Sequence, residues 1–491
     1  MNFSRDVFQD QAAERLALLE LARDGERREW SFGEVERCSA QIAGMLTQRG
    51  VRRGDVVMTL IGNRPEWVLS MMACFQIGAV TLPCTEQLRA KDLRLRLDVA
   101  RPRLIVADER NREELLAAAP DCPVVLIPDE SLLEAEPAPF AELAEGDPAL
   151  ITFTSGTAGE PKAVVHAQRY LYGQRAQAEH WLGAERDDLV WCTAASGWSK
   201  SARNVFIAPW LMGASALLHD ARFDPKERLD LIERERVNVL CMAPTEYRVI
   251  AKRARLRALP SLRGMVAAGE ALNPEVLKVW RSATGLDIRD GYGQTETGQM
   301  TGMGIGIRAR SGSMGKALAG VRLSVRDGEL VADPTSVPTF FLGYLGESVT
   351  RAPDGSWSID DRRAGGPWRT GDQVTEEDDG YLRFEGRADD VIISAGYRIG
   401  PFEVESALVA HPAVAEAAVV AAPDEERGAV VRAIVVLREG QTPSAELASE
   451  LQEHAKRETA PYKYPRIIDF AAELPKTASG KVRRAALRSE R

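Results

Sequence analysis

Several features that define other classes of protein are scarce in this sequence. Its 491 residues include only six cysteines, and no two of them are close enough in sequence to form a redox motif or a zinc site. The five histidines are also far apart, and none has a second at metal-ligand spacing. Because 63 basic residues stand against 72 acidic ones, no basic excess indicates a nucleic-acid partner. We therefore expect a protein of a reducing compartment without a structural metal.

Signals for export and membrane insertion are missing as well. The N-terminus, Met-Asn-Phe-Ser-Arg-Asp, is polar, whereas a secretory signal needs a basic start and an apolar run. One uncharged stretch, residues 67–85, has the length of a membrane span, but turn-forming residues such as Gly78 and Pro83 interrupt it. We interpret it as a buried helix over 67–76 followed by a strand over 79–82. A cytoplasmic protein with no integral membrane segment is expected.

What the sequence does contain, from about residue 30 to 340, is an alternation of helical periodicity with short apolar strands. Helices between strands indicate an α/β fold with mostly parallel sheets covered on both faces. Gly- and Pro-rich turns over about 312–386 predict a β-rich subdomain inside a large N-terminal domain, residues 1–387. A compact α+β pattern then restarts, with helices expected over 401–410 and 445–458, so residues 388–491 are expected to form a small, separate C-terminal domain. The strands expected in the alternating region cover residues 56–61, 104–107, 124–127, 150–154, 237–243 and 264–268.

A loop rich in hydroxyls and glycines follows one of these strands. From Thr154 to Lys162 it reads Thr-Ser-Gly-Thr-Ala-Gly-Glu-Pro-Lys. Glycines let backbone N–H groups surround an anion, and the hydroxyls and the lysine add donors around phosphate oxygens. The spacing is not that of the common P-loop, which needs Ser or Thr directly after Gly-Lys, whereas Gly480-Lys481 is followed by Val482. The loop predicts a triphosphate site; taken alone, it leaves a Ser/Thr/Gly-rich surface turn as the alternative.

The loop resembles the signature of the adenylate-forming superfamily, which contains acyl-CoA synthetases, luciferases and the adenylation domains of peptide synthetases. The chain is most similar to the medium-chain and aryl acyl-CoA synthetases, because residues 197–201 and 396–401 match that group's variants. It departs from the usual pattern at Ala158, Ala163 and Trp368. Eight further segments match the superfamily in its order: residues 243–245, 268–270, 291–297, 315–320, 368–372, 386–390, 396–399 and 475–481.

The resemblance implies an AMP-forming acyl-CoA ligase, which joins a carboxylic acid to AMP and then transfers the acyl group to CoA. The first step brings two anions together, so charge neutralisation and alignment should matter more than a general base. By resemblance, Lys481 is catalytic and contacts the carboxylate and the α-phosphate, and Thr295 binds the α-phosphate. Glu296 would hold Mg²⁺, which takes few protein carboxylates.

The resemblance also implies where ATP binds. Asp372 would accept hydrogen bonds from the ribose hydroxyls, with Arg387 supporting it. Tyr292 would face the adenine, although a structural aromatic is the alternative. The complete predicted ATP-binding set is Thr154, Ser155, Gly156, Thr157, Ala158, Gly159, Glu160, Pro161, Lys162, Gly269, Glu270, Asp290, Gly291, Tyr292, Gly293, Gln294, Thr295, Asp372, Arg387 and Lys481.

A further set of residues is implied for CoA on the small domain. By resemblance, Asp389 is the pivot about which that domain swings, and Gly396 leaves room for the pantetheine arm. Each charged candidate is equally well explained as an ordinary surface residue. The predicted CoA-binding residues are Ala395, Gly396, Tyr397, Arg398, Arg427, Tyr462, Lys463 and Tyr464.

The acid itself is expected among Trp198, the segment 203–206 with Asn204, and Gly293. Relatives that activate acetate carry a tryptophan at the position of Gly293, so a glycine there favours a medium-chain or aromatic acid over acetate. His166 either gates this pocket or is a structural histidine.

Two other functions are alternatives to the acyl-CoA ligase. A freestanding adenylation enzyme would load the acid onto a carrier protein's phosphopantetheine, but no fused carrier domain is expected from this sequence, and the Arg and Lys candidates for CoA favour free CoA. A noncatalytic nucleotide sensor would be expected to have lost Lys481, Glu296 or Asp372, and all three are present. The expected partners are small molecules, namely a carboxylic acid, ATP and CoA, with a homodimer as the one protein assembly considered.

Overall fold

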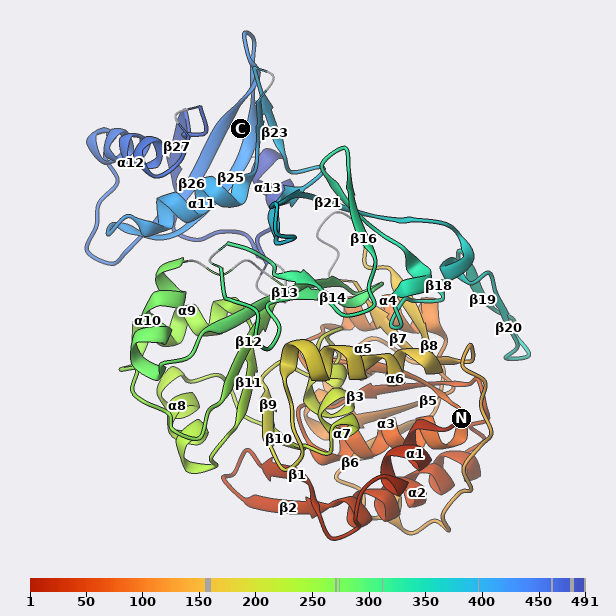
Figure 1. Cartoon of the computed structure of the whole chain (residues 1–491). Helices are drawn as coiled ribbons and strands as arrows, with labels where there is room; N and C mark the ends of the chain where they lie inside the picture. The colour runs from red at the N-terminus through yellow and green to blue at the C-terminus, as the bar shows by residue number, and fades with distance from the viewer. Residues whose placement is uncertain are drawn as a thin grey trace.

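The computed structural model describes residues 1–154, 160–269, 272, 274–310, 312–395, 397–460, 462–476 and 481–489. Figure 1 shows a large N-terminal part built on two sheets, with a small blue C-terminal domain above it. The α/β architecture with a small α+β domain is therefore confirmed.

The first sheet has seven strands in the order β18-β8-β7-β4-β3-β5-β6. Its parallel centre is flanked by the antiparallel pair β7 and β8. Helix α3 begins with Pro65 at its first turn and stops at Gly78, whose φ of 72° suits the left-handed C-cap. The strands are β3 (Val56–Leu60), β4 (Val80–Cys84), β5 (Leu104–Asp108), β6 (Val124–Ile127), β7 (Pro148–Phe153), β8 (Ala163–Ala167) and β18 (Gly343–Tyr344); its helices are α2 (Phe32–Gln48), α3 (Pro65–Ile77), α4 (Ala90–Ala100) and α5 (Arg112–Ala117).

The second sheet has nine strands in the order β15-β14-β13-β12-β11-β9-β10-β1-β2. The sequence pattern had started at about residue 30, so the first two of these strands were missed; they extend the far edge. Helices α8 (Pro225–Arg234), α9 (Pro244–Arg253) and α10 (Pro274–Thr284) lie along its outer side (Figure 1). The strands are β1 (Leu16–Leu21), β2 (Arg27–Ser31), β9 (Leu189–Cys192), β10 (Ser215–His219), β11 (Val239–Met242), β12 (Gly264–Ala268), β13 (Ile288–Gln294), β14 (Gly298–Gly302) and β15 (Lys316–Ala317).

The largest core cluster is rich in aromatic side chains. Trp67 and Phe206 pack edge to face with ring centroids 5.8 Å apart, and Phe206 lies 5.1 Å from Trp210. Two of the segments around this core, η3 and η4, are π-helical turns, a rare form that is frequent at functional sites. The elements here are α1 (Phe3–Gln9), α6 (Gln168–Gln177), η3 (Ala178–Leu182), η4 (Arg203–Ile207) and α7 (Ala208–Leu211).

The β-rich stretch contributes strands to several sheets. Its own four-stranded sheet has the order β16-β17-β21-β22, while β15 and β18 join the two large sheets. Asp327 and Gly328 both have positive φ, 54° and 77°, as a two-residue hairpin turn requires. The strands are β16 (Leu323–Arg326), β17 (Glu329–Ala332), β19 (Val349–Arg351), β20 (Trp357–Ile359), β21 (Trp368–Glu376) and β22 (Leu382–Arg387), and the short 3-10 turns of the chain are η1 (Glu109–Asn111), η2 (Glu130–Leu133), η5 (Pro334–Ser336) and η6 (Arg362–Ala364).

The C-terminal domain has a three-stranded sheet, β25-β26-β27, and a core of its own around Val404, Leu408, Val431 and Leu451. No helix in the described part of the chain is both long and apolar enough to cross a membrane. The elements are β23 (Ile392–Ser394), β24 (Tyr397–Ile399), α11 (Pro401–Ala410), β25 (Val414–Asp424), β26 (Gly428–Leu437), α12 (Ala445–Glu458), β27 (Ile467–Phe470) and α13 (Arg484–Ser489).

Candidate functional site

The base of the predicted phosphate loop is closed by two hydrogen bonds. The Thr154 N–H donates to the Lys162 carbonyl at 2.9 Å, and the Lys162 N–H donates to Thr154 Oγ1 at 2.9 Å. Since β7 and β8 are antiparallel neighbours, these two hydrogen bonds continue the pairing of the two strands. Glu160 is exposed and Pro161 half-buried. The predicted residues Ser155, Gly156, Thr157, Ala158 and Gly159 lie outside the described part of the chain.

Lys162 is connected through Tyr344 to Glu296, the predicted metal ligand. Its Nζ lies 2.8 Å from Glu347 Oε1 and 4.6 Å from the centre of the Tyr344 ring. The Tyr344 hydroxyl in turn donates to Glu296 Oε1 at 2.8 Å. Burial, reinforced by the Glu296 carboxylate, raises the pKa of Tyr344, so the phenol stays a donor. Sequence reasoning missed both Tyr344 and Glu347, because only the pairing of β18 with β8 brings them here.

Thr295 and Glu296 lie in the tight turn between β13 and β14. The Gln294 N–H donates to Thr297 Oγ1 at 3.0 Å across this turn. A Cβ at position 293 would lie 1.9 Å from the Gly298 carbonyl oxygen. In this conformation the hairpin leaves no room for a side chain at position 293, so the glycine does not by itself leave a tunnel open.

Asp372 is the centre of a cluster that joins four predicted residues. Its buried carboxylate accepts hydrogen bonds from Gln294 Nε2 at 2.9 Å, from Arg387 Nη1 at 3.2 Å and from the Tyr292 hydroxyl. Burial raises the pKa of Asp372, and the Arg387 guanidinium opposes that shift. Tyr292 thus helps to hold Asp372. The cluster fixes a carboxylate at the edge of the site with one oxygen, Oδ1, still able to accept a further donor.

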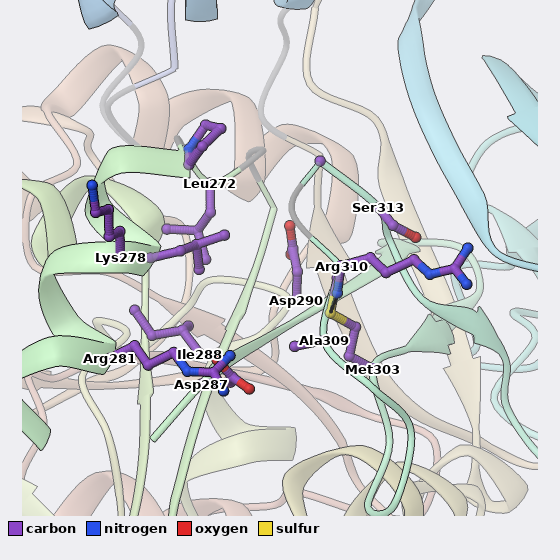
Figure 2. Close-up of a pocket in the computed structure, with 13 residues that line it drawn as sticks. Leu272, Lys278, Arg281, Asp287, Ile288, Asp290, Met303, Ala309, Arg310 and Ser313 are labelled. Carbon is purple, nitrogen blue, oxygen red and sulfur yellow. Dashed lines mark hydrogen bonds and ion pairs between the residues drawn. The ribbon is translucent and has the colours of Figure 1, made fainter. Parts of the chain in front are cut away.

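A cavity of about 280 Å³ opens beside the N-terminal end of β13. Figure 2 shows Asp290 projecting between Leu272 and Arg310, with Met303 below. Asp290 Oδ1 accepts from the Gly291 N–H at 2.8 Å, and burial raises the pKa of this carboxyl to about 8. A mostly apolar wall with a few polar groups is typical of a small-molecule pocket. The strand that forms one wall of this cavity thus also carries Tyr292 and the turn with Thr295.

The neighbouring end of β12 adds the predicted Gly269, whose φ of 103° few other residues adopt. A Cβ there would lie 3.4 Å from Lys200 Nζ. The predicted Glu270, which follows, lies outside the described residues.

The predicted hinge and the predicted catalytic lysine are linked through the C-terminal helix. The Asp389 carboxylate lies 3.7 Å from Arg387 Nε, while its carbonyl accepts from Arg488 Nη2 at 2.9 Å. Lys481 is half-buried and precedes Val482, which forms a β-bridge with Lys476. Val482 packs against the core of the C-terminal domain, so Lys481 belongs structurally to that domain.

Several of the described CoA candidates contact one another on the small domain. The Ala395 N–H donates to the Arg427 carbonyl at 3.0 Å, and the rings of Tyr397 and Tyr462 stack at 4.4 Å. The next residue, Lys463, forms an ion pair with Glu403 and packs beside Tyr462, with its Nζ 5.7 Å from the ring centre. Tyr464 instead faces Lys456 and Arg466. Gly396 lies outside the described residues, as does the side chain of Arg398.

The predicted acid pocket contains a small cavity of about 20 Å³. That is room for about one water molecule, so an acid must displace side chains to enter. Asn204 is buried; its Nδ2 donates to the Lys200 carbonyl at 2.9 Å, and its Oδ1 accepts from Gln177 Nε2 at 2.9 Å. Trp198 is half-buried on the same loop. The cavity is lined by Trp181, Cys192, Ala194, Lys200, Asn204, Cys241, Met242, Ala243 and Ala268.

His166 lies next to this region and is fully buried, with its ring centre 4.0 Å from that of Tyr170. Burial, with a smaller contribution from the charge of Arg203, lowers the pKa of His166 to about 3. The imidazole is therefore neutral at physiological pH.

Comparison with known proteins gives consistent matches over the whole chain. The model of the AMP-binding enzyme family matches residues 6–346, and that of the AMP-binding enzyme C-terminal domain matches residues 403–481. A Bacillus subtilis protein named uncharacterized acyl-CoA ligase YtcI is 38% identical over 97% of this chain and 93% of its own. The mitochondrial acyl-coenzyme A synthetase ACSM4 of Homo sapiens is 38% identical over 95% of this chain and 85% of its own.

Solved structures agree with these matches. A Brucella canis acyl-CoA synthetase is 34% identical, with a TM-score of 0.74 over 99% of this chain and 94% of its own. The anthranilate CoA ligase AuaEII, solved with anthranoyl-AMP, is 28% identical, with a TM-score of 0.87 over 100% of this chain and 97% of its own.

Proposed function

The chain belongs to the AMP-binding enzyme family and is an AMP-forming acyl-CoA ligase, and from that premise we propose that its acid is a medium-chain or aromatic carboxylic acid. In the first step a carboxylate oxygen bonds to the α-phosphorus of ATP as the bond to pyrophosphate breaks. In the second step the CoA sulfur bonds to the acyl carbon, AMP leaves, and the thiol proton passes to solvent. The anthranilate CoA ligase, solved with anthranoyl-AMP, supports an aromatic acid, and the resemblance of residues 197–201 and 396–401 to the medium-chain and aryl acyl-CoA synthetases supports the range of acids.

The Asp372 cluster is the observation that carries our assignment of the nucleotide site. A buried carboxylate is costly unless donors hold it, and here Gln294 and Arg387 do so at 2.9 and 3.2 Å. The remaining acceptor position on Asp372 Oδ1 suits a hydroxyl of a ribose. We place the adenine in the cavity at Asp290 and Leu272, and the phosphates toward Thr295 and the loop base at Thr154 and Lys162.

Magnesium fits the donor set that this chain offers. Glu296 is a hard oxygen ligand, and the Tyr344 hydroxyl orients it from 2.8 Å. Mg²⁺ typically takes one or two protein carboxylates and fills its other positions with water and phosphate oxygens. When bound, the ion would neutralise phosphate charge; Glu296 would hold it, and Thr295 would orient the α-phosphate beside it.

For the thiol step we propose the end of the small domain where Tyr397 stacks on Tyr462. A flat aromatic pair with Lys463 and Arg427 nearby offers stacking surface and positive charge to the nucleotide part of CoA. Because Lys481 is anchored to the same domain, the two steps would use two orientations of that domain, with Asp389 as the pivot.

A panel of acids tests this proposal. Medium-chain and aromatic acids, with ATP, Mg²⁺ and CoA, should yield acyl-CoA, AMP and pyrophosphate in equal amounts, measured by chromatography and mass spectrometry. Acetate should be a poor substrate, and a loaded carrier protein should not replace CoA. Release of ADP, or efficient transfer to the carrier protein but not to CoA, would contradict the proposal.

A further inference from the structure

Two arginines are buried in the described part of the chain, and they differ in whether a carboxylate lies beside them. Arg228 is 7% exposed and lies 3.2 Å from the Glu246 carboxylate. Arg203 is 5% exposed, and among the described residues it forms no ion pair. Its Nε and Nη1 also have no hydrogen-bond partner. The Tyr170 hydroxyl is a neutral hydrogen-bonding neighbour of Arg203. A buried guanidinium without an anion is nevertheless costly, so Arg203 calls for an anionic partner that the described protein does not supply.

The position of Arg203 indicates what that partner is. It begins the π-helical turn η4, directly before Asn204, and both Asn204 and Lys200 line the small cavity. On the other side, Arg203 Nη1 lies 3.4 Å from where a Cβ of Gly298 would be, at the end of the turn that holds Thr295. Arg203 therefore lies between the reacting end of the site and the cavity that we assign to the acid.

The side chains around Arg203 and the small cavity are also more polar than the binding of an alkyl chain requires. Several buried polar atoms here have no hydrogen-bond partner: both ring nitrogens of His166, Gln177 Oε1, Gln299 Oε1 and Trp181 Nε1. Lys200 adds a second cation, with Nζ 3.1 Å from the Ala268 carbonyl. Trp181 Nε1 and the neutral His166 ring can donate, whereas the two glutamine oxygens accept. A pocket with unpaired polar groups selects a ligand that can pair with them and rejects the analogue that cannot.

From this arrangement we propose that the acid is a dicarboxylic acid, whose second carboxylate accepts hydrogen bonds from the Arg203 guanidinium while the first reacts with ATP. The proposal rests on the ligase function above and makes Arg203 a specificity-determining residue. A net positive wall favours an anion over a neutral hydroxyl or amide at that position, because a charge-assisted hydrogen bond is stronger than a neutral one.

Pairs of acids of equal length test the proposal. The wild-type enzyme should use adipate with a kcat/KM roughly 10- to 100-fold above that for hexanoate, the gain of one charge-assisted hydrogen bond, and terephthalate above benzoate. Arg203→Met should remove this preference by lowering adipate turnover and leaving hexanoate within about 3-fold. Arg203→Lys, which keeps the charge, should retain part of it.

Arg228→Met is the matched control, since it removes a buried arginine that has a carboxylate partner. It should lower the melting temperature, because Glu246 loses its cation, without changing the adipate-to-hexanoate ratio. Arg203→Met should keep or raise the melting temperature of the ligand-free protein. Added adipate should raise the melting temperature of the wild type but not of Arg203→Met, which gives a readout independent of turnover.

Three outcomes would overturn the proposal. The first is a wild-type preference for hexanoate over adipate, which needs no variant to fold. The second is an equal fall for both acids in Arg203→Met, since Arg203 would then serve the reacting carboxylate that the two acids share. The third is a stronger preference for a neutral hydroxy acid. If no acid of any kind released pyrophosphate, the ligase function itself would have failed, which is distinguishable from all three.

Discussion

Replacing Asp290 by asparagine tests the electrostatics of the pocket that we assign to adenine. The pKa of the Asp290 carboxyl is raised to about 8 because desolvation of this partly buried side chain disfavours its charged form, with backbone donors at Gly291 and Leu272 opposing the shift. At neutral pH the group is therefore mostly protonated. An asparagine side chain has nearly the same shape and, like the neutral acid, both accepts and donates, so Asp290→Asn should keep the KM for ATP within about 3-fold at pH 7.

The stability of the two proteins should diverge with pH. An unfolded aspartate has a pKa of about 3.9, so the pKa of this carboxyl is about four units higher in the folded protein than in the unfolded one. Because the folded-state pKa is the higher one, stability from Asp290 is fully present below about pH 4 and is lost as the pH rises toward 8. Full ionisation would cost up to about 5 kcal/mol, and solvent reaching the cavity reduces this, so we expect a loss of about 2 to 5 kcal/mol.

Chemical denaturation of both proteins between about pH 5 and pH 9 measures this difference directly. The wild type should lose stability relative to Asp290→Asn by up to about 1.4 kcal/mol per pH unit within the window, and other titrating groups cancel in the comparison. Above pH 8 the variant should be the more stable protein. A stability difference that does not change with pH would show that Asp290 is already ionised at neutral pH, and the reasoning would be wrong.

Three further changes test other parts of the site. Tyr344→Phe removes the donor that orients Glu296, so the Mg²⁺ concentration for half-maximal rate should rise by about 10-fold; an unchanged Mg²⁺ titration would contradict the role of Tyr344. Asp372→Asn should raise the KM for ATP by roughly 10- to 100-fold, measured by steady-state kinetics, because the charge facing Arg387 is lost. Lys481→Ala should slow adenylation by roughly 10² to 10³ while sparing thioester formation from supplied acyl-adenylate; equal losses in both steps would refute the two-orientation account.

Local sequence signals were sufficient for many of the elements. The predicted helices 401–410 and 445–458 and the strands 124–127 and 264–268 coincide with α11, α12, β6 and β12. These segments have clear boundaries, such as the Ser444 side chain that caps α12 by accepting from the Leu447 N–H. The strands of residues 16–31 were missed because they lie before the alternating pattern, and they pair with each other and with β10.

Local sequence signals did not predict how the residues of the site contact one another. Tyr292, Gln294, Asp372 and Arg387 were each predicted, but their meeting at one carboxylate depends on the contact of β13 with the separate sheet of β21 and β22. Nothing local predicts that Tyr344 reaches Glu296, 48 residues away in the sequence.

Gly293 and Arg203 are two further residues whose surroundings could not be predicted from the sequence. Gly293 suggested an open tunnel, whereas its immediate neighbour in space is the Gly298 carbonyl. Arg203 lay within the segment expected at the acid pocket, and only the structure shows that its guanidinium is buried without an anion among the described residues. Such facts depend on neighbours distant in sequence, which composition and spacing do not report.

The claim that an acyl-adenylate is formed is tested most directly by isotope exchange without CoA. Labelled pyrophosphate, incubated with the enzyme, unlabelled ATP, Mg²⁺ and a suitable acid, should become incorporated into ATP, because adenylation is reversible and needs only the first half of the site. The exchange should require the acid and should fall by roughly 10² to 10³ in Lys481→Ala. Exchange that proceeds without the acid, or appears only when CoA is added, would contradict the account.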